Sequence, residues 1–161
     1  MFVHRLVTLP FTDPDQCRDA YAEAVTLSRV HQAAVIERAP DGTLDVPENQ
    51  APHAGATTVG ATATGGLIGL LGGPLGTLIG ATAGALVGDA AEARRDQEST
   101  AALILLSADV PDGTAMLVLD LSEESTEPVD ALAARYGTTA HREPAETFAT
   151  RLRQAWKSTG G

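Results

Sequence analysis

Residues 75–88 read LGTLIGATAGALVG, with glycine at every fourth position. The repeated glycines are Gly76, Gly80, Gly84 and Gly88. Residues four apart lie on one face of an α-helix, so these glycines would form a stripe along which a second helix can approach to backbone contact. The repeat belongs to a longer segment, residues 49–88, that contains no Asp, Glu, Lys or Arg and holds eleven of the chain's sixteen glycines. We therefore expect the fold to be organised around this segment.

The segment is predicted to form two helical arms rather than one long helix. The first arm covers about residues 57–71 and carries Gly65 and Gly69 in register, and the second covers about residues 75–91. Between them, Gly-Gly-Pro at residues 72–74 breaks the helix, and proline suits the first position of the second arm. The segment therefore predicts a helical hairpin. The apolar face of the second arm, away from the glycines, is formed by Leu75, Leu78, Ile79, Leu86 and Val87.

Three settings fit this hairpin: a re-entrant or shallow membrane insertion, burial among copies of the chain in a soluble oligomer, or a flexible linker. Each arm has roughly 15 residues, whereas a bilayer-spanning helix needs about 20 apolar ones. A flexible linker would lack the apolar face and the four-residue register. If the strands before and after the segment share one sheet, the hairpin must enter and leave on the same side of any membrane.

The sequence before the segment predicts the first half of a small α+β body. Apolar, β-branched runs indicate strands, and apolar residues at helical spacing after the start signal Asp13-Pro14 indicate an amphipathic helix. The predicted elements are a strand at residues 2–9, a helix at 13–30, a strand at 33–38, a turn at 40–42 and a short strand at 43–46.

The sequence after the segment repeats this order. Residues 101–106 fit either a strand or the buried end of a helix that starts at residue 89, and we favour the helix, ending before Pro111. The further elements are a buried strand at 115–121, a helix at 127–136 closed by Gly137, a short strand at 138–142, and a last helix from Glu143-Pro144 with Phe148, Leu152, Ala155 and Trp156 on one face. Two β-α-β units predict a ferredoxin-like split fold. We divide the chain into residues 1–48 and 89–161, the two halves of this body, and the inserted hairpin at 49–88.

Composition narrows the range of partners. The net charge of −10 argues against nucleic acid, because phosphate binding needs clustered Lys and Arg, and against electrostatic docking on anionic lipid. The single cysteine, Cys17, excludes an internal disulfide, and we expect it to be a small buried residue. The N-terminus lacks the pattern of a signal peptide. The expected location is the cytoplasm or the cytoplasmic face of the inner membrane.

The sequence contains no residue pattern that indicates catalysis or metal binding. The chain contains no GxxxxGK[ST] and no HExxH sequence, and its four histidines lack the spacing of metal ligands. Glu123, Glu124 and Glu127 form an acidic cluster that we interpret as favourable charge at a helix N-terminus. We therefore predict no enzyme activity, no catalytic or metal-binding residue and no cofactor. The histidines are His4, His31, His53 and His141.

A turn sequence, Ala39-Pro40-Asp41-Gly42-Thr43, precedes the glycine-rich segment, and the motif Val110-Pro111-Asp112-Gly113-Thr114-Ala115 follows it. Together with the β-α-β opening, the apolar strand after this motif and the helix-strand-helix at residues 127–156, they resemble a large bacterial group of uncharacterised proteins, often labelled membrane proteins of unknown function. The resemblance covers most of the chain. It implies a ferredoxin-like body with a glycine-zipper insertion, and no activity.

The leading hypothesis is a non-enzymatic, self-associating protein whose hairpin packs against copies of itself, inserts shallowly in a membrane, or does both. Its partners are then the chain itself, as a homo-oligomer, and a lipid bilayer, but not nucleic acid. The alternative is a small-ligand binding or sensing module, an idea that rests on analogy with other ferredoxin-like domains. The predicted interface residues are Gly65, Gly69, Gly76, Gly80, Gly84, Gly88, Leu75, Leu78, Ile79 and Leu86.

Overall fold

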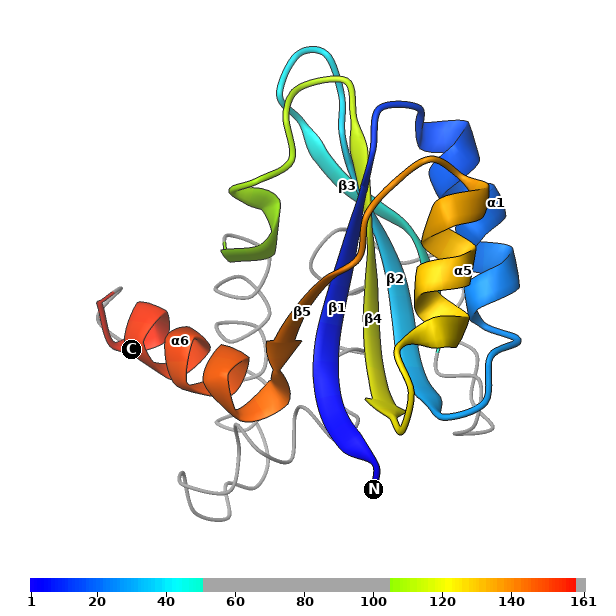
Figure 1. Ribbon diagram of the computed structural model, residues 1–161. Helices are drawn as coiled ribbons and strands as arrows, with labels where there is room; N and C mark the ends of the chain where they lie inside the picture. The colour runs from blue at the N-terminus through cyan, green and yellow to red at the C-terminus, as the bar shows by residue number, and fades with distance from the viewer. Residues whose placement is uncertain (51–104, 159–161) are drawn as a thin grey trace.

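The chain is an α+β protein, as predicted (Figure 1). The computed structural model describes residues 1–50 and 105–158. Within these ranges the elements are β1 (Val3–Phe11), α1 (Pro14–Ala24), β2 (Val30–Arg38), β3 (Leu44–Gln50), β4 (Ala115–Glu123), α5 (Glu127–Arg135), β5 (His141–Pro144) and α6 (Ala145–Ser158). The predicted hairpin lies outside the described residues, except for Asn49 and Gln50, which end β3.

The strands before and after the glycine-rich segment belong to one sheet. The sheet has five strands in the order β3-β2-β4-β1-β5, and every neighbouring pair is antiparallel. β4 lies between β1 and β2, and β1 lies between β4 and β5, so two β-α-β units interleave. The sequence predicts that the segment enters and leaves any membrane on the same side if the strands before and after it share one sheet. They do share one sheet.

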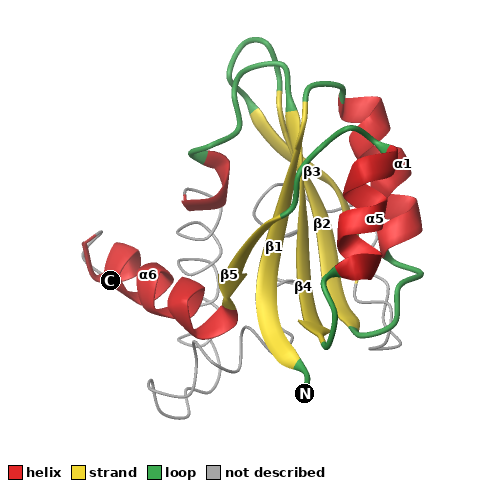
Figure 2. Ribbon diagram, in the orientation of Figure 1, coloured by secondary structure: helices red, strands yellow, loops and turns green. Residues whose placement is uncertain are grey.

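The two faces of the sheet carry separate hydrophobic clusters. α1 and α5 lie side by side on the first face, whereas α6 and a short helical turn at residues 105–107 lie on the second (Figure 2). β4 contributes to both clusters, because alternate residues of a strand point to opposite faces. Leu117 and Leu119 pack beneath α1 and α5, and Met116 and Val118 pack on the side of α6. Burial on both faces explains why this strand is apolar at every position from Ala115 to Leu119.

Cys17 is buried in the first cluster, as predicted. Burial is the main cause that raises the pKa of its thiol to about 12, with a further contribution from the carboxylate of Glu37. The thiol is therefore protonated at neutral pH and serves as a small packing residue.

Several element boundaries differ from the prediction. α1 ends at Ala24 rather than near Val30, because Thr26 turns back to bond the carbonyl of Glu23 through both its amide and its hydroxyl. β1, β2, β3 and β4 are each longer than predicted. β5 covers His141–Pro144 rather than residues 138–142, because the amide of Thr138 caps α5 and its hydroxyl bonds the carbonyl of Pro10.

The two Pro-Asp-Gly-Thr turns lie next to each other and are joined by Arg38, at the end of β2. Its guanidinium donates to the carbonyls of Ser107, Val110 and Gly42 at 3.0, 2.8 and 3.1 Å. Gly42 and Gly113 have φ angles of 90° and 77°, which favour glycine at these positions. Arg38 thus fixes the segment through which the chain returns from residues 51–104 to β4.

We expect Arg38→Ala to lower the free energy of unfolding by about 2 kcal/mol, because three carbonyl groups lose a charged donor but remain close enough to solvent to be partly hydrated. Urea denaturation followed by circular dichroism would measure the change. Arg153→Ala is the matched control, since Arg153 bonds only the carbonyl of Ala149 in its own helix. An equal loss in both variants would contradict a specific role for Arg38.

Candidate functional site

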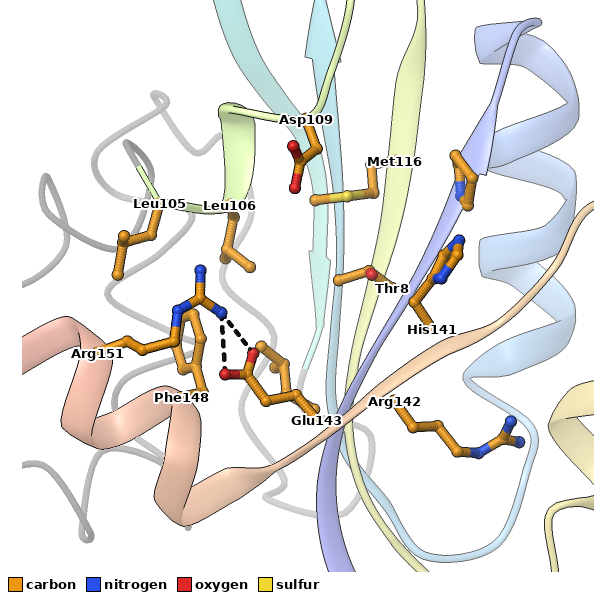
Figure 3. A pocket seen from close by; sticks show the side chains of 12 residues that line it. Thr8, Leu105, Leu106, Asp109, Met116, His141, Arg142, Glu143, Phe148 and Arg151 are labelled. Atoms are coloured by element: carbon orange, nitrogen blue, oxygen red, sulfur yellow. Dashed lines mark hydrogen bonds and ion pairs between the residues drawn. The ribbon is translucent and has the colours of Figure 1, made fainter.

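A cavity of about 470 Å³ opens on the second face of the sheet, between residues 105–109, α6 and the strands β1 and β5 (Figure 3). Its volume lies within the range of small-molecule sites in proteins. Its lining is mostly apolar at the bottom and polar at the rim. The apolar side chains are Leu6, Pro10, Leu105, Leu106, Met116 and Phe148.

Strand alternation decides which residues of β1 reach this cavity. Leu6 and Thr8 point to the second face, whereas Val7 and Leu9 pack beneath α1 and α5. β5 extends the wall, because His141 pairs with Thr8 and therefore shares its face. The cavity is thus built from elements that lie far apart in the sequence.

The rim carries one closed ion pair. Nη1 of Arg151 donates to the two carboxylate oxygens of Glu143 at 2.9 and 2.7 Å, as Figure 3 shows. The neighbouring Arg142 points away from the cavity and binds Glu123 and Asp130 on the other face. Its bonds to Glu123 are the main cause that raises the pKa of the Arg142 guanidinium. Neither guanidinium therefore offers a free positive charge to the cavity.

Three other polar side chains border the cavity: Thr8, Asp109 and His141. Within the described part of the chain, none of the three side chains forms a hydrogen bond or an ion pair. Asp109 and His141 are exposed, and Thr8 is half-buried. An apolar bottom with a few unpaired polar groups at the rim is the usual arrangement of a small-molecule site. The chemistry that these residues offer is binding.

A second polar cluster lies on the same face, nearer the N-terminal end of β1. Nε2 of His4 bonds Oδ1 of Asp120, and Nε2 of His31 lies 2.9 Å from the hydroxyl of Ser122. The two imidazole rings meet edge to face with their centroids 5.7 Å apart. Gln32 pairs directly with Asp120 across β2 and β4. Three neighbouring strands therefore place polar side chains together in an otherwise apolar sheet.

Two acceptors of this cluster, Oδ2 of Asp120 and Oε1 of Gln32, are closed to solvent and have no hydrogen-bond partner among the described residues. The two residues are 1% and 4% exposed. A buried polar group without a partner costs about 1–3 kcal/mol of folding free energy. In residues 1–50 and 105–158, no group of three or more His, Cys, Asp or Glu side chains is arranged to hold a metal ion.

The acidic cluster predicted at the start of a helix is divided among three roles. Glu123 ends β4, is buried, and binds Arg5 and Arg142. Glu124 binds the N-terminal ammonium group, and only Glu127 stands in the first turn of α5. The prediction of favourable helix-end charge therefore holds for Glu127 and is wrong for Glu123.

The predicted interface residues, from Gly65 to Gly88, all lie outside the described residues. Sequence reasoning missed both the cavity and the polar cluster, and treated the histidines as scattered. One signal could have pointed to the cluster: Asp120 is the only charged residue between Ala115 and Leu121, in a run that otherwise predicts a buried strand. A carboxylate at such a position needs a partner.

Comparisons of the chain with protein-family models, with curated proteins and with solved structures find no match. The class is therefore defined by the fold and the site alone: an α+β protein with a five-stranded antiparallel sheet and a cavity on one face. Among residues 1–50 and 105–158, no helix has both the length and the apolar character needed to cross a bilayer.

Proposed function

We propose that the chain is a non-enzymatic, self-associating protein. Its body has a ferredoxin-like split fold, and its inserted glycine-zipper hairpin at residues 49–88 packs against the hairpins of other copies. The observation that carries the proposal is the shared sheet, in which β4 lies between β1 and β2. Because strands from both sides of the insertion interleave, the insertion leaves and rejoins one rigid body. A hairpin meets that requirement, whereas a single bilayer-crossing helix does not.

The strand order supports the ferredoxin-like assignment. If β3 is set aside as an additional edge strand, the remaining order β2-β4-β1-β5 is that of two interleaved β-α-β units. α1 and α5, the two crossover helices, lie on the same face. This arrangement leaves the second face for α6 and residues 105–110.

The interface is tested by Gly80→Leu. A leucine on the glycine stripe would separate two helices that touch through backbone atoms, so we expect the assembly to dissociate while the body stays folded. Light scattering after chromatography measures the particle size, and circular dichroism measures the fold. Thr82→Leu is the matched control, because residue 82 would lie on the predicted apolar face of the same helix, where one more leucine is compatible with packing. Wild-type size for Gly80→Leu would show that this stripe is not the interface.

The setting of the assembly, in the cytoplasm or on the cytoplasmic face of a membrane, is tested by cell fractionation. Recovery as a large particle without detergent would favour packing among copies alone. Recovery only with detergent would favour insertion of the hairpin into the bilayer. In either case the glycine stripe is the surface that makes the contact.

A second function, small-ligand binding, is favoured by one specific observation. The cavity of about 470 Å³ has an apolar bottom and three unpaired polar side chains at its rim. It is formed by the body, so ligand binding and self-association through the hairpin can occur in the same molecule. A calorimetric titration with small apolar molecules tests whether the cavity binds any ligand.

A further inference from the structure

The cavity on the second face has an apolar floor that suits an apolar group of a ligand. Leu6, Leu106, Met116 and Phe148 line it and also belong to the hydrophobic cluster under α6. Their positions are fixed by packing, since each is at most 6% exposed. An apolar group that enters the cavity therefore meets a preformed surface.

The rim has an excess of negative charge. Glu143 and Arg151 neutralise each other through two short hydrogen bonds, and Arg142 is held on the other face by Glu123 and Asp130. The carboxylate of Asp109 remains as the charge without a counter-ion among the described residues that line the cavity. Figure 3 draws its carboxylate apart from the ion pair of Arg151 and Glu143. A ligand with a positive group complements this rim, and a carboxylate or a phosphate is repelled by it.

We infer that the cavity binds an organic ammonium compound, with the apolar body of the ligand on Leu6, Met116 and Phe148 and its ammonium group paired with Asp109. The inference rests on the ligand-binding function proposed above and adds the chemical class of the ligand. Thr8 and His141, which also line the cavity, carry groups that can hydrogen-bond a polar substituent of the ligand.

The test compares three probes of similar size that differ at one group. Tryptamine carries an ammonium, tryptophol a hydroxyl and indole-3-acetate a carboxylate. Calorimetric titration of the full chain is expected to give a dissociation constant for tryptamine about tenfold lower than for tryptophol, because the ammonium pairs with the Asp109 carboxylate as charge with charge, whereas the hydroxyl of tryptophol is neutral. Indole-3-acetate is expected to bind weakest.

Asp109→Asn is expected to weaken tryptamine binding about tenfold and to leave tryptophol binding unchanged. Asp109 is exposed and makes no ion pair with any described residue, so this variant should keep its fold, which circular dichroism verifies. Asp19→Asn, an exposed carboxylate on α1 at the opposite face, is the matched control and should bind like the wild type.

The possible results distinguish a failure of ligand binding at the cavity from an error in the chemical class of the ligand. If none of the three probes binds, the cavity is not a ligand site, and the ligand-binding function fails with it. If all three bind equally, or indole-3-acetate binds best, the site stands and the ammonium class is wrong. If Asp109→Asn keeps the full preference for tryptamine, Asp109 is not the counter-ion.

Discussion

Glu123→Ala is expected to lower the free energy of unfolding by about 3–5 kcal/mol, the usual cost of removing one partner from a buried ion pair. The side chain of Glu123 is 3% exposed at the end of β4. It accepts hydrogen bonds from Arg142 at 2.9 and 3.1 Å and from Arg5 at 3.0 Å. Its removal would leave two guanidinium groups, 18% and 29% exposed, without their shared counter-ion.

The loss is expected to be large because the network also holds elements together. Arg142 on β5 further binds Asp130 at 2.8 Å and the carbonyl of Thr126 at 3.1 Å, so it connects the edge strand to the start of α5. Its bonds to Glu123 are the main cause that raises the pKa of the Arg142 guanidinium. The Arg142 guanidinium therefore stays charged, and it cannot reduce the desolvation energy of a buried charge by losing a proton.

Urea denaturation measures this loss, and Glu143→Ala provides the control. Glu143, which follows Arg142 on β5, also pairs with an arginine, but its partner Arg151 on α6 is 49% exposed. For such an exposed pair we expect a change of about 0–1 kcal/mol. Equal losses for Glu123→Ala and Glu143→Ala would show that the network around Glu123 is not buried in solution.

The parts of the fold that could be predicted are those fixed by neighbours in sequence. The helix start at Asp13-Pro14 was predicted correctly, because the Asp13 carboxylate accepts the amide of Asp15 and proline needs no amide partner there. Gly42 was placed in a turn because its turn sequence favours a positive φ angle, and its φ angle is 90°. The apolar run from Ala115 to Leu119 was sufficient to predict a fully buried strand.

The end of α1 and the start of β5 were predicted wrongly, and the reasons differ. Val25 and Leu27 continue the apolar pattern of α1 and do pack against the first cluster, yet they follow the end of the helix. The spacing of the apolar residues therefore predicted which side chains are buried, but not where the helical backbone ends. Thr138 was assigned to β5, but its amide and hydroxyl are used by Ala133 and Pro10, which are contacts that only the tertiary structure supplies.

The candidate site could not be predicted, because its residues come from four separate regions of the chain. Thr8, Asp109 and His141 share a rim only after β5 pairs with β1 and residues 105–109 fold back over the sheet. None of these residues stands in a motif. The sequence did contain a sign of the neighbouring polar cluster, the aspartate at position 120, but its partner His4 lies 116 positions away in the chain.

Phe148→Ala is expected to lower the free energy of unfolding by about 3–4 kcal/mol, near the lower end of the range for deleting a buried phenylalanine. Phe148 is 1% exposed and is among the largest fully buried side chains of the described residues. It joins α6 to Leu6 and Met116 in the second hydrophobic cluster. The space left by the side chain would open into the existing cavity, where water can enter. The free-energy cost of an unfilled cavity is therefore reduced.

Phe148→Leu is the control for this variant and is expected to cost about 1 kcal/mol, because most of the apolar contact is kept. Urea denaturation followed both by far-ultraviolet circular dichroism and by the fluorescence of Trp156, the only tryptophan of the chain, gives the midpoints. If Phe148→Ala leaves both midpoints unchanged, α6 does not contribute to the stability of the sheet. If only the fluorescence midpoint falls, α6 unfolds separately, and the cavity that it helps to enclose opens without unfolding of the sheet.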